Sequence, residues 1–336
     1  MNEPPKNPKF GLLMCPFALR EQIVRNMELM DAFYFSTLSK RSKRLVHNAK
    51  IRIESLLFCF GSWIPNDKIS VEAIEERNSF RIGLSESNAP SERDPAIMDG
   101  VKLASFINET ADDYRKKLSA HILFIFHSKL INVHIERNLA EPLRKFFLWD
   151  VSKTFDFVRI GWCGSILISS EDLKFILQTI KSIRCCLGIK IDDAHFKYQE
   201  AMECENFLAK YSAQWLDTVG ILHRNPKMKK LHLQNIQGEQ INDLLKQWIN
   251  GEVDLEFLIG SNRNGLPADV ILDGIVTLDP TIAHEQAKEV YPRRVINGQL
   301  MNIQRKIDGQ LATIHLTEKE CFAIMWTEKR LAELRN

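Results

Sequence analysis

The segment 10–50 constrains the fold more than any other part of the sequence, because it carries more apolar side chains than three short helices can bury. Pro16 suits the first turn of a helix, where its missing N–H costs no hydrogen bond. Leu19, Ile23 and Met27 follow at four-residue spacing and predict one apolar helix face. A helical unit this small, with apolar side chains to spare, predicts that the segment docks on a partner. The competing interpretation is that these side chains pack on residues 53–100.

Two further helices are predicted within the same segment. Asp31 is the candidate N-cap of the second helix, whose apolar residues Ala32, Phe35 and Leu38 follow at three-residue steps. Ser39 is the candidate N-cap of a third, basic helix. The Lys/Arg run at 40–44 is typical of a solvated helix face, and a nuclear-localisation or nucleic-acid patch is the alternative.

Overall composition is that of an ordinary globular chain. Of 336 residues, 45% are hydrophobic and 26% are charged, and the formal net charge is only +2. We therefore expect no global attraction to nucleic acid or to anionic lipid. The seven cysteines are odd in number and form no C-x-x-C pair, which predicts reduced, mostly buried thiols in a cytoplasmic or nuclear protein.

Neither end of the chain nor its interior carries a membrane signal. Residues 1–9 hold three prolines and no apolar run, so we expect a disordered lead and no secretory signal. The longest apolar run, 122–126, is far shorter than the roughly 20 residues that a membrane span needs. A soluble protein that binds no membrane is expected.

Strands and helices are predicted to alternate after the N-terminal helices. Short apolar runs at 56–60 and 80–84, separated by Gly, Pro, Asn and Ser, predict strands and loops. Alternating apolar residues predict further strands at 131–135 and 155–160.

Two amphipathic helices are predicted farther along the chain. The first begins at a capping box of Ser169 and Asp172 and carries its apolar stripe as far as Ile183, with Gly188 as its stop. The second carries its stripe over 241–249 and stops at Gly251.

Short strands accompany these helices, at 187–191 and 255–259, and a third lies at 230–233. The segment 230–233, ending near Asn235, has the pattern of a leucine-rich strand and its turn. Strand starts fall roughly 25 to 45 residues apart, so any repeat is irregular.

The C-terminal part predicts a β-hairpin. Asp308-Gly309 is typical of a type I′ turn, and it joins the segments 304–307 and 311–316. A third strand is predicted at 322–326, and residues 327–336 are expected to fray.

No catalytic, phosphate-binding or metalloprotease motif is present in the sequence. The glycine-rich segment 161–165 is predicted to be a turn. His121 and His127 would share one face of a strand, but a zinc site would need further ligands. Cys185 and Cys186 are predicted to pack at a helix end rather than to form a redox pair.

Aromatic residues offer the remaining hint of a binding surface. Five tryptophans could build a concave surface on the C-terminal part, although two of them, Trp215 and Trp248, lie on predicted helix stripes and are expected in the core. The five are Trp149, Trp162, Trp215, Trp248 and Trp326.

The first forty residues resemble an F-box, in the version found in the large nematode F-box families. The resemblance is carried by Leu12, Leu13, Pro16, Glu21, Ile23, Met27, Ser36, Leu38, Ser39 and Lys40. One departure is Cys15, which stands before the proline where the family usually has leucine, and this should weaken packing without abolishing docking. The segments 230–233, 244–251 and 255–256, with the hairpin ending at Trp326, resemble the F-box-associated domain of the same proteins.

This resemblance implies an α+β protein: a three-helix F-box followed by a mixed α/β domain with irregular leucine-rich-repeat-like strand–helix units and a C-terminal β-hairpin. It implies a lead at 1–9, an F-box at 10–52 and an F-box-associated domain at 53–336, clearest at 226–326.

The implied function is that of a non-enzymatic substrate receptor of a cullin-based ubiquitin ligase. The F-box would bind a Skp-type adaptor, and through it cullin, and the C-terminal domain would bind an unidentified target protein. Because Skp-type adaptors are acidic, the basic helix would also speed association. The expected adaptor-binding residues are Leu12, Leu13, Pro16, Leu19, Ile23, Leu38 and Ser39.

Two other classes of function stay open at this point. One is an F-box-bearing scaffold that acts without ubiquitin transfer, and the other is an unrecognised enzyme in the α/β domain. No metal or cofactor is predicted.

Overall fold

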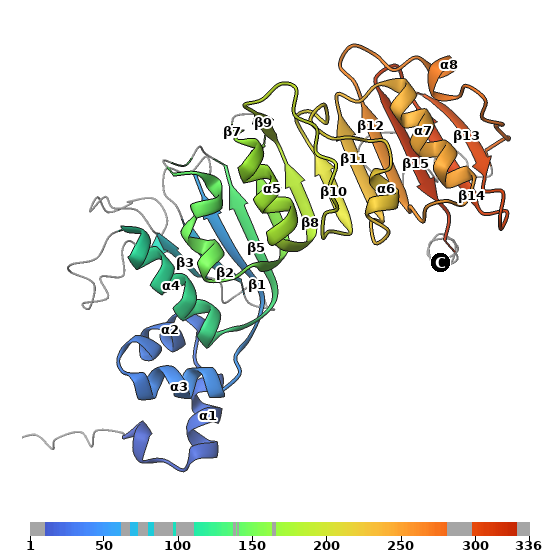
Figure 1. Cartoon of the computed structure of the whole chain (residues 1–336). Coiled ribbons are helices and arrows are strands. Elements are labelled where there is room, and N and C mark those ends of the chain that lie inside the picture. The colour runs from blue at the N-terminus through green and yellow to red at the C-terminus, as the bar shows by residue number, and fades with distance from the viewer. Residues whose placement is uncertain are drawn as a thin grey trace, which may run out of the picture. The chain divides into compact units, whose positions relative to one another are not determined.

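The computed structural model describes residues 11–61, 68–72, 80–83, 97–98, 111–136, 139, 141–162, 166–280 and 298–327. The chain is mixed α+β: three N-terminal helices precede a large, mostly parallel sheet and C-terminal strands (Figure 1). It divides into two compact units, one of residues 1–59 and 63–132 and the other of residues 60–62 and 133–336. The predicted lead, most of the glycine-rich turn and the predicted C-terminal tail lie outside the described residues.

The first unit opens with short helices whose starts follow local chemistry. Pro16 is the N-cap of α1, and Ser39 is the N-cap of α3 through a reciprocal capping box with Ser42. The second helix starts earlier than predicted: its N-cap is Glu28, not Asp31, because the buried Leu29 already belongs to its core face. The helices are η1 (Leu12–Met14), α1 (Phe17–Arg25), α2 (Leu29–Thr37) and α3 (Lys40–Asn48).

The rest of this unit consists of strands and one long helix. The elements are β1 (Arg52–Phe60), β2 (Lys68–Glu72), β3 (Phe80–Gly83), β4 (Ile97–Met98), α4 (Ala111–Ile125) and β5 (His127–Ile135), which runs on into the second unit. Strands β1, β2 and β3 pair antiparallel, and β4 pairs parallel to β3. The apolar run before His127 is helical rather than extended, because Leu118, Ile122 and Ile125 bury one face at helical spacing.

The second unit contains the large sheet. Its strands are β6 (Thr154–Ile160), β7 (Ile166–Ile168), β8 (Lys181–Leu187), β9 (Ile189–Ile191), β10 (Asn206–Ala209), β11 (Lys230–Gln234), β12 (Phe257–Ser261), β13 (Gln299–Gln304), β14 (Leu311–Leu316) and β15 (Glu320–Met325). Its helices are η2 (Leu143–Lys145), η3 (Phe147–Asp150), α5 (Ser170–Thr179), α6 (Ile221–Arg224), α7 (Gly238–Ile249) and α8 (Ala268–Ile271). Strands β7 and β9 pair separately from the main sheet.

The order of the main strands places the helices. Strands β6, β8, β10, β11 and β12 are parallel neighbours added in sequence order, and β15, β14 and β13 continue the sheet antiparallel. Because parallel crossovers are right-handed, strands added in one direction put their connecting helices on one face. Figure 1 shows α5 and α7 on the same side of this sheet. A side chain at Gly260 would collide with Ile241, so α7 packs directly on β12.

Helix α5 is shorter than predicted. It begins at the cap of Ser169, as expected, but ends at Thr179, and Ile183 lies in strand β8, where it is largely exposed. The predicted helix was too long because Ile180 and Ile183 continue its apolar spacing. Strand pairing on both sides of β8 decides the conformation of this segment instead. Gly188 therefore stops no helix. It separates β8 from β9, where a Cβ would lie 2.8 Å from the backbone carbon of Trp162.

Two other predictions about single residues need correction. Cys185 and Cys186 are consecutive residues of β8, not a helix end, so they are buried on opposite faces of the sheet. Burial raises the pKa of both thiols. Trp215 is in the core as predicted, but it lies in a loop rather than on a helix.

The predicted concave tryptophan surface is absent from the described residues. Trp149, Trp215, Trp248 and Trp326 are each at most 6% exposed, and only Trp162 reaches the surface, at 41%. Large aromatic side chains contribute most when fully buried, which explains why four of the five serve the core.

The C-terminal hairpin forms, but its turn is not type I′. Strands β13 and β14 pair antiparallel from Gln299–Leu316 to Gln304–Leu311, and β15 adds the predicted third strand. Gly309 has φ +73°, whereas Asp308 does not have the positive φ that a type I′ turn requires at both central residues. The turn is longer because Arg305 N–H donates to the Gln310 carbonyl at 2.8 Å and closes a four-residue loop.

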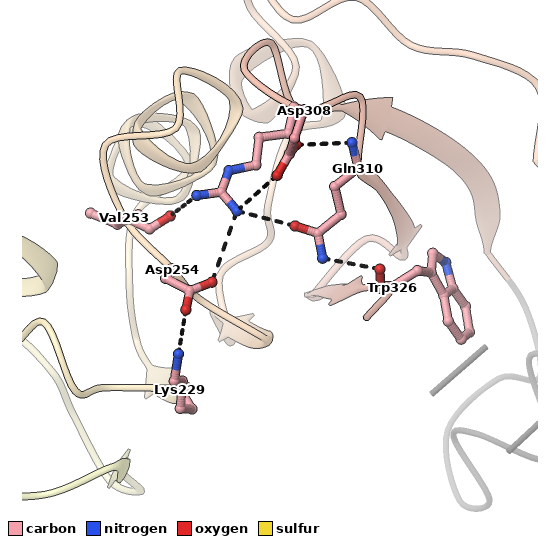
Figure 2. Close-up of polar contacts among 7 residues, drawn as sticks. Lys229, Val253, Asp254, Asp308, Gln310 and Trp326 are labelled. Atoms are coloured by element: carbon pink, nitrogen blue, oxygen red, sulfur yellow. Dashed lines mark hydrogen bonds and ion pairs between the residues drawn. The ribbon is translucent and has the colours of Figure 1, made fainter. Parts of the chain in front are cut away.

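Arg305 connects this hairpin to the rest of the unit through a polar network whose other members are labelled in Figure 2. Its guanidinium donates to the Val253 carbonyl at 3.3 Å and to Gln310 Oε1 at 3.1 Å, and it lies 3.6 Å from Asp308. The outer members of the network are Asp254, Lys229 and Trp326. A largely buried arginine with this many partners is a structural hub, because its charge is compensated only in this arrangement.

Candidate functional site

The N-terminal helices keep large apolar side chains at their surface. Helix α2 buries Leu29, Ala32 and Phe33, while Met30, Tyr34 and Leu38 are 38%, 44% and 75% exposed. These three exposed residues are four apart, so they form one stripe along α2, here called the α2 outer stripe. Contiguous apolar side chains exposed to water are typical of a surface that binds a partner.

Helix α1 and the turn before it add exposed apolar side chains. Met14 is 90% exposed, Phe17 is 52% exposed and Leu19 is 44% exposed. Val24 is the buried residue of α1, and within the predicted stripe Leu19 is exposed while Ile23 and Met27 are half-buried. The sequence pattern identified these residues as apolar but not which side of the helix the core would take.

The predicted adaptor-binding residues fall into three environments. Pro16, Leu19 and Leu38 are exposed, and Leu12 and Ile23 are half-buried. Ser39 is occupied as a helix cap: its hydroxyl accepts from Ser42 N–H at 3.0 Å. Leu13 lies in η1, and its side chain is outside the described residues.

Helix α4 covers the inner sides of α2 and α3. Phe33 packs edge-on against the His121 ring, with centroids 5.9 Å apart, and His121 Nε2 lies 2.7 Å from Ser36 Oγ. Because Ser36 Oγ already donates its only proton to the Phe33 carbonyl, His121 Nε2–H must be the donor in the second bond. Burial, helped by Lys43, lowers the pKa of His121 to about 4, so the ring is neutral at pH 7.

Helix α3 contacts α4 through a second histidine. The His47 ring stacks on Phe124 at 4.2 Å, and His47 Nδ1 lies 2.6 Å from the Phe124 carbonyl oxygen. The Lys43 ammonium sits over the same Phe124 ring at 4.9 Å. The inner sides of α2 and α3 are therefore held by α4, which leaves their outer sides to solvent or to a partner.

The exposed apolar side chains lie beside positive charge. Residues 11–50 contain seven Lys or Arg and three Asp or Glu. Within the run 40–44, Lys40, Arg41 and Arg44 are exposed, while Lys43 is half-buried. This charge balance favours an acidic partner surface.

Signals of other kinds of site are weak in the described part of the chain. The described residues include no group of three His, Cys, Asp or Glu side chains placed to hold a metal ion. A hollow of about 1140 Å³ in the second unit offers only two charged side chains, Glu318 and Lys319, which are consecutive in the chain. Among the helices that the structure describes, none is long and apolar enough to span a membrane.

Comparisons of the chain with family models, with curated proteins and with solved structures gave no match.

Sequence reasoning missed four of the exposed apolar residues: Met14, Phe17, Met30 and Tyr34. A signal for two of them was present, because Met30, Tyr34 and Leu38 repeat at four-residue steps. That stripe competes with the three-residue stripe of Ala32, Phe35 and Leu38, and only packing against α4 distinguishes the inner from the outer side.

Proposed function

We propose that this chain is a substrate-receptor subunit of a cullin-based ubiquitin ligase. Segment 10–52 acts as an F-box that binds a Skp-type adaptor, and the following α/β domain, with its irregular leucine-rich-repeat-like units, binds a target protein. In this proposal the chain transfers no ubiquitin itself. It raises the effective concentration of the target at the ligase.

One observation carries the proposal: the α2 outer stripe stays exposed on a helix whose inner side is held by α4, and Leu19 stays exposed on the neighbouring α1. Spaced apolar anchors on a rigid helix are the form in which helical segments fill a partner's groove. The order of the main sheet supports the second half of the proposal, because parallel strands added in one direction with their helices on one face also characterise leucine-rich repeats.

Capture of adaptor and cullin by the full-length chain tests the proposal. We expect both to co-purify with the wild-type protein and both to be lost with the double variant Leu19→Asp/Leu38→Asp. The matched control is Leu167→Asp/Val219→Asp in the second unit. It changes two aliphatic side chains of similar exposed fraction, 59% for Leu167 and 68% for Val219. This control should retain both proteins.

Three outcomes separate the candidate functions. Retention of the adaptor by Leu19→Asp/Leu38→Asp would contradict the docking surface. Adaptor binding without cullin would favour the scaffold that acts without ubiquitin transfer. Absence of the adaptor from the wild-type complex would remove the F-box proposal altogether.

A further inference from the structure

The face of the sheet opposite α5 and α7 carries two rows of aligned side chains. The strand registers place the first row at Phe157, Arg184, Asn206, Lys230 and Phe257. They place the second row at Arg159, Cys186, Leu208, His232 and Ile259. Because alternate residues of a strand point to opposite faces, these residues lie away from Leu231 and Leu258, which fill the helix-covered core. We call these two rows the open-face rows.

Two cations of the first open-face row are exposed to solvent, whereas Cys186 in the second row is buried. Arg184 and Lys230 are exposed, and Phe157, Leu208 and Ile259 are half-buried. Neither row contains an aspartate or a glutamate. Within the part of the chain that the structure describes, Arg184 and Lys230 pair with no carboxylate.

Aromatic rings hold the cations of this face in place. The Arg184 guanidinium lies over the Phe157 ring at 5.1 Å, and the Arg159 guanidinium lies over the Trp162 ring at 4.9 Å. Lys210, one residue beyond β10, also lies over Trp162. Arg159 is also ion-paired with Glu136, so Arg184 is the cation that stacking pre-organises without neutralising it, because a guanidinium stacked on a ring keeps its N–H edge available to an anion.

We propose that the open-face rows bind an extended, carboxylate-rich segment of a partner protein. Arg184 and Lys230 are separated by two strand spacings, which is about 10 Å. Three residues of a polyproline II segment rise about 9 Å and complete one turn, so carboxylates three residues apart lie on the same side of such a segment and reach both cations. A single phosphate would need cations that converge on one point, and this separation does not provide them.

The same surface fits a protein segment better than a nucleic acid. Half-buried apolar side chains flank the cations, with Leu208 in the neighbouring row and Phe257 beside Lys230, where Phe257 also packs against Phe322, Ile324 and Trp326. They suit apolar side chains between the carboxylates. The chain's net charge of +2 supplies little of the general attraction that phosphate backbones require. The inference rests on the proposed function only in that this surface would be the one that selects the target.

Peptide binding to the full-length protein tests the inference without any adaptor. The probe is a fluorescein-labelled twelve-residue peptide of repeated Glu-Ser-Val, and its counterpart has Gln in place of Glu. Fluorescence anisotropy should show saturable binding of the Glu peptide, with affinity at least tenfold higher than for the Gln peptide and falling as salt is added.

Charge reversal on the open face supplies the decisive variants. Arg184→Glu/Lys230→Glu should weaken binding of the Glu peptide at least tenfold. The control Arg263→Glu/Lys319→Glu reverses two exposed cations elsewhere in the unit and should change the affinity less than twofold. Thermal melts by circular dichroism establish that both variants fold. Arg184→Gln/Lys230→Gln repeats the test if charge reversal prevents folding.

Several results would overturn the inference: no binding of the Glu peptide, equal binding of the Glu and Gln peptides, or unchanged binding by the open-face variant. Tight binding of a twelve-nucleotide single-stranded RNA with none of the Glu peptide would identify a nucleic-acid surface instead. Leu19→Asp/Leu38→Asp should bind the Glu peptide normally. Failure of adaptor capture and failure of peptide binding are therefore distinguishable.

Discussion

At the scale of single residues, the buried polar groups of the second unit depend on one another. Trp326 Nε1–H donates to Thr313 Oγ1 at 2.7 Å, and the Thr313 hydroxyl donates to Asn302 Oδ1 at 2.8 Å. Thr313 and Asn302 are completely buried, and they lie on adjacent strands of the hairpin. The chain of hydrogen bonds links the last strand to the edge strand through a single hydroxyl group.

Replacement of Thr313 by valine should therefore be costly despite the similar shape of the two side chains. The substitution leaves Trp326 Nε1–H and Asn302 Oδ1 without this partner in an apolar interior. We expect the free energy of unfolding to fall by about 2 kcal/mol, measured by urea denaturation. The control, Thr277→Val at an exposed position, should change it by less than about 0.5 kcal/mol. Equal effects of the two substitutions would contradict this account.

His121 makes stability depend on pH. Its folded-state pKa of about 4 lies below the ordinary value of 6.5, so the unfolded chain binds the proton more readily. The stabilising contribution of the neutral ring is complete above pH 6.5 and is lost progressively as the pH falls towards 4. Replacement of His121 by glutamine keeps a donor to Ser36 but removes the titrating imidazole, and with it this dependence of stability on pH.

Urea denaturation of wild type and His121→Gln between pH 7 and pH 4 measures this effect. The difference in free energy of unfolding between wild type and His121→Gln should become smaller as the pH falls. His127 and His134, whose pKa values are also lowered by burial, are present in both proteins and cancel in the difference. Parallel pH profiles would show that His121 contributes no titrating stability.

At the scale of elements, local capping chemistry decided where several helices begin. The cap residues of α3 and α5, Ser39 and Ser169, were predicted from sequence and occur in the structure. The ends of helices depended on neighbours instead, as α5 illustrates. Ser39 also belongs to the expected adaptor-binding set, so its two roles must be separated by experiment.

Two substitutions at Ser39 separate these roles. Ser39→Ala removes the cap and should lower the free energy of unfolding by about 1 kcal/mol. Ser39→Asp keeps a hydrogen-bond acceptor and places a negative charge at the helix N-terminus, so it should cost less than half as much. If capping is the role of Ser39, adaptor capture should survive Ser39→Asp. Loss of capture by a stably folded Ser39→Asp would instead indicate direct contact with the adaptor.

At the scale of the whole molecule, charge is distributed unevenly although the net value is small. The N-terminal helices hold an excess of basic residues, with exposed cations on α3, and the open-face rows hold a second group. Local fields of this kind act on the rate of association with an oppositely charged partner more than on the lifetime of the complex.

Charge reversal on α3 should therefore slow adaptor binding. For Lys40→Glu/Arg44→Glu we expect the association rate constant to fall by about tenfold at low salt, with little change in the dissociation rate constant. Surface plasmon resonance at several ionic strengths measures both, and the difference from wild type should narrow as salt is added. A change confined to dissociation would show that these cations contact the adaptor directly.

The predictability of the candidate site had a clear limit. Residues such as Leu19 and Leu38 were recognised from their spacing and from the F-box resemblance, and both prove to be exposed. Met30 and Tyr34 were not recognised, because two overlapping stripes on one helix look equally apolar in sequence. The open-face rows were also missed, because they join residues from five strands that are far apart in sequence.

The sequence by itself determined the features that depend on neighbours along the chain: the α+β class, the capped starts of helices, the amphipathic helix α7 and the existence of the C-terminal hairpin. Tertiary structure alone decided where α5 ends and β8 begins, which side of α2 is buried, and which strands become neighbours in the sheet. The physical reason is the distance along the chain over which each kind of interaction acts. Caps and periodicity act within one or two helical turns, whereas strand pairing and burial are set by segments that meet only in the folded chain.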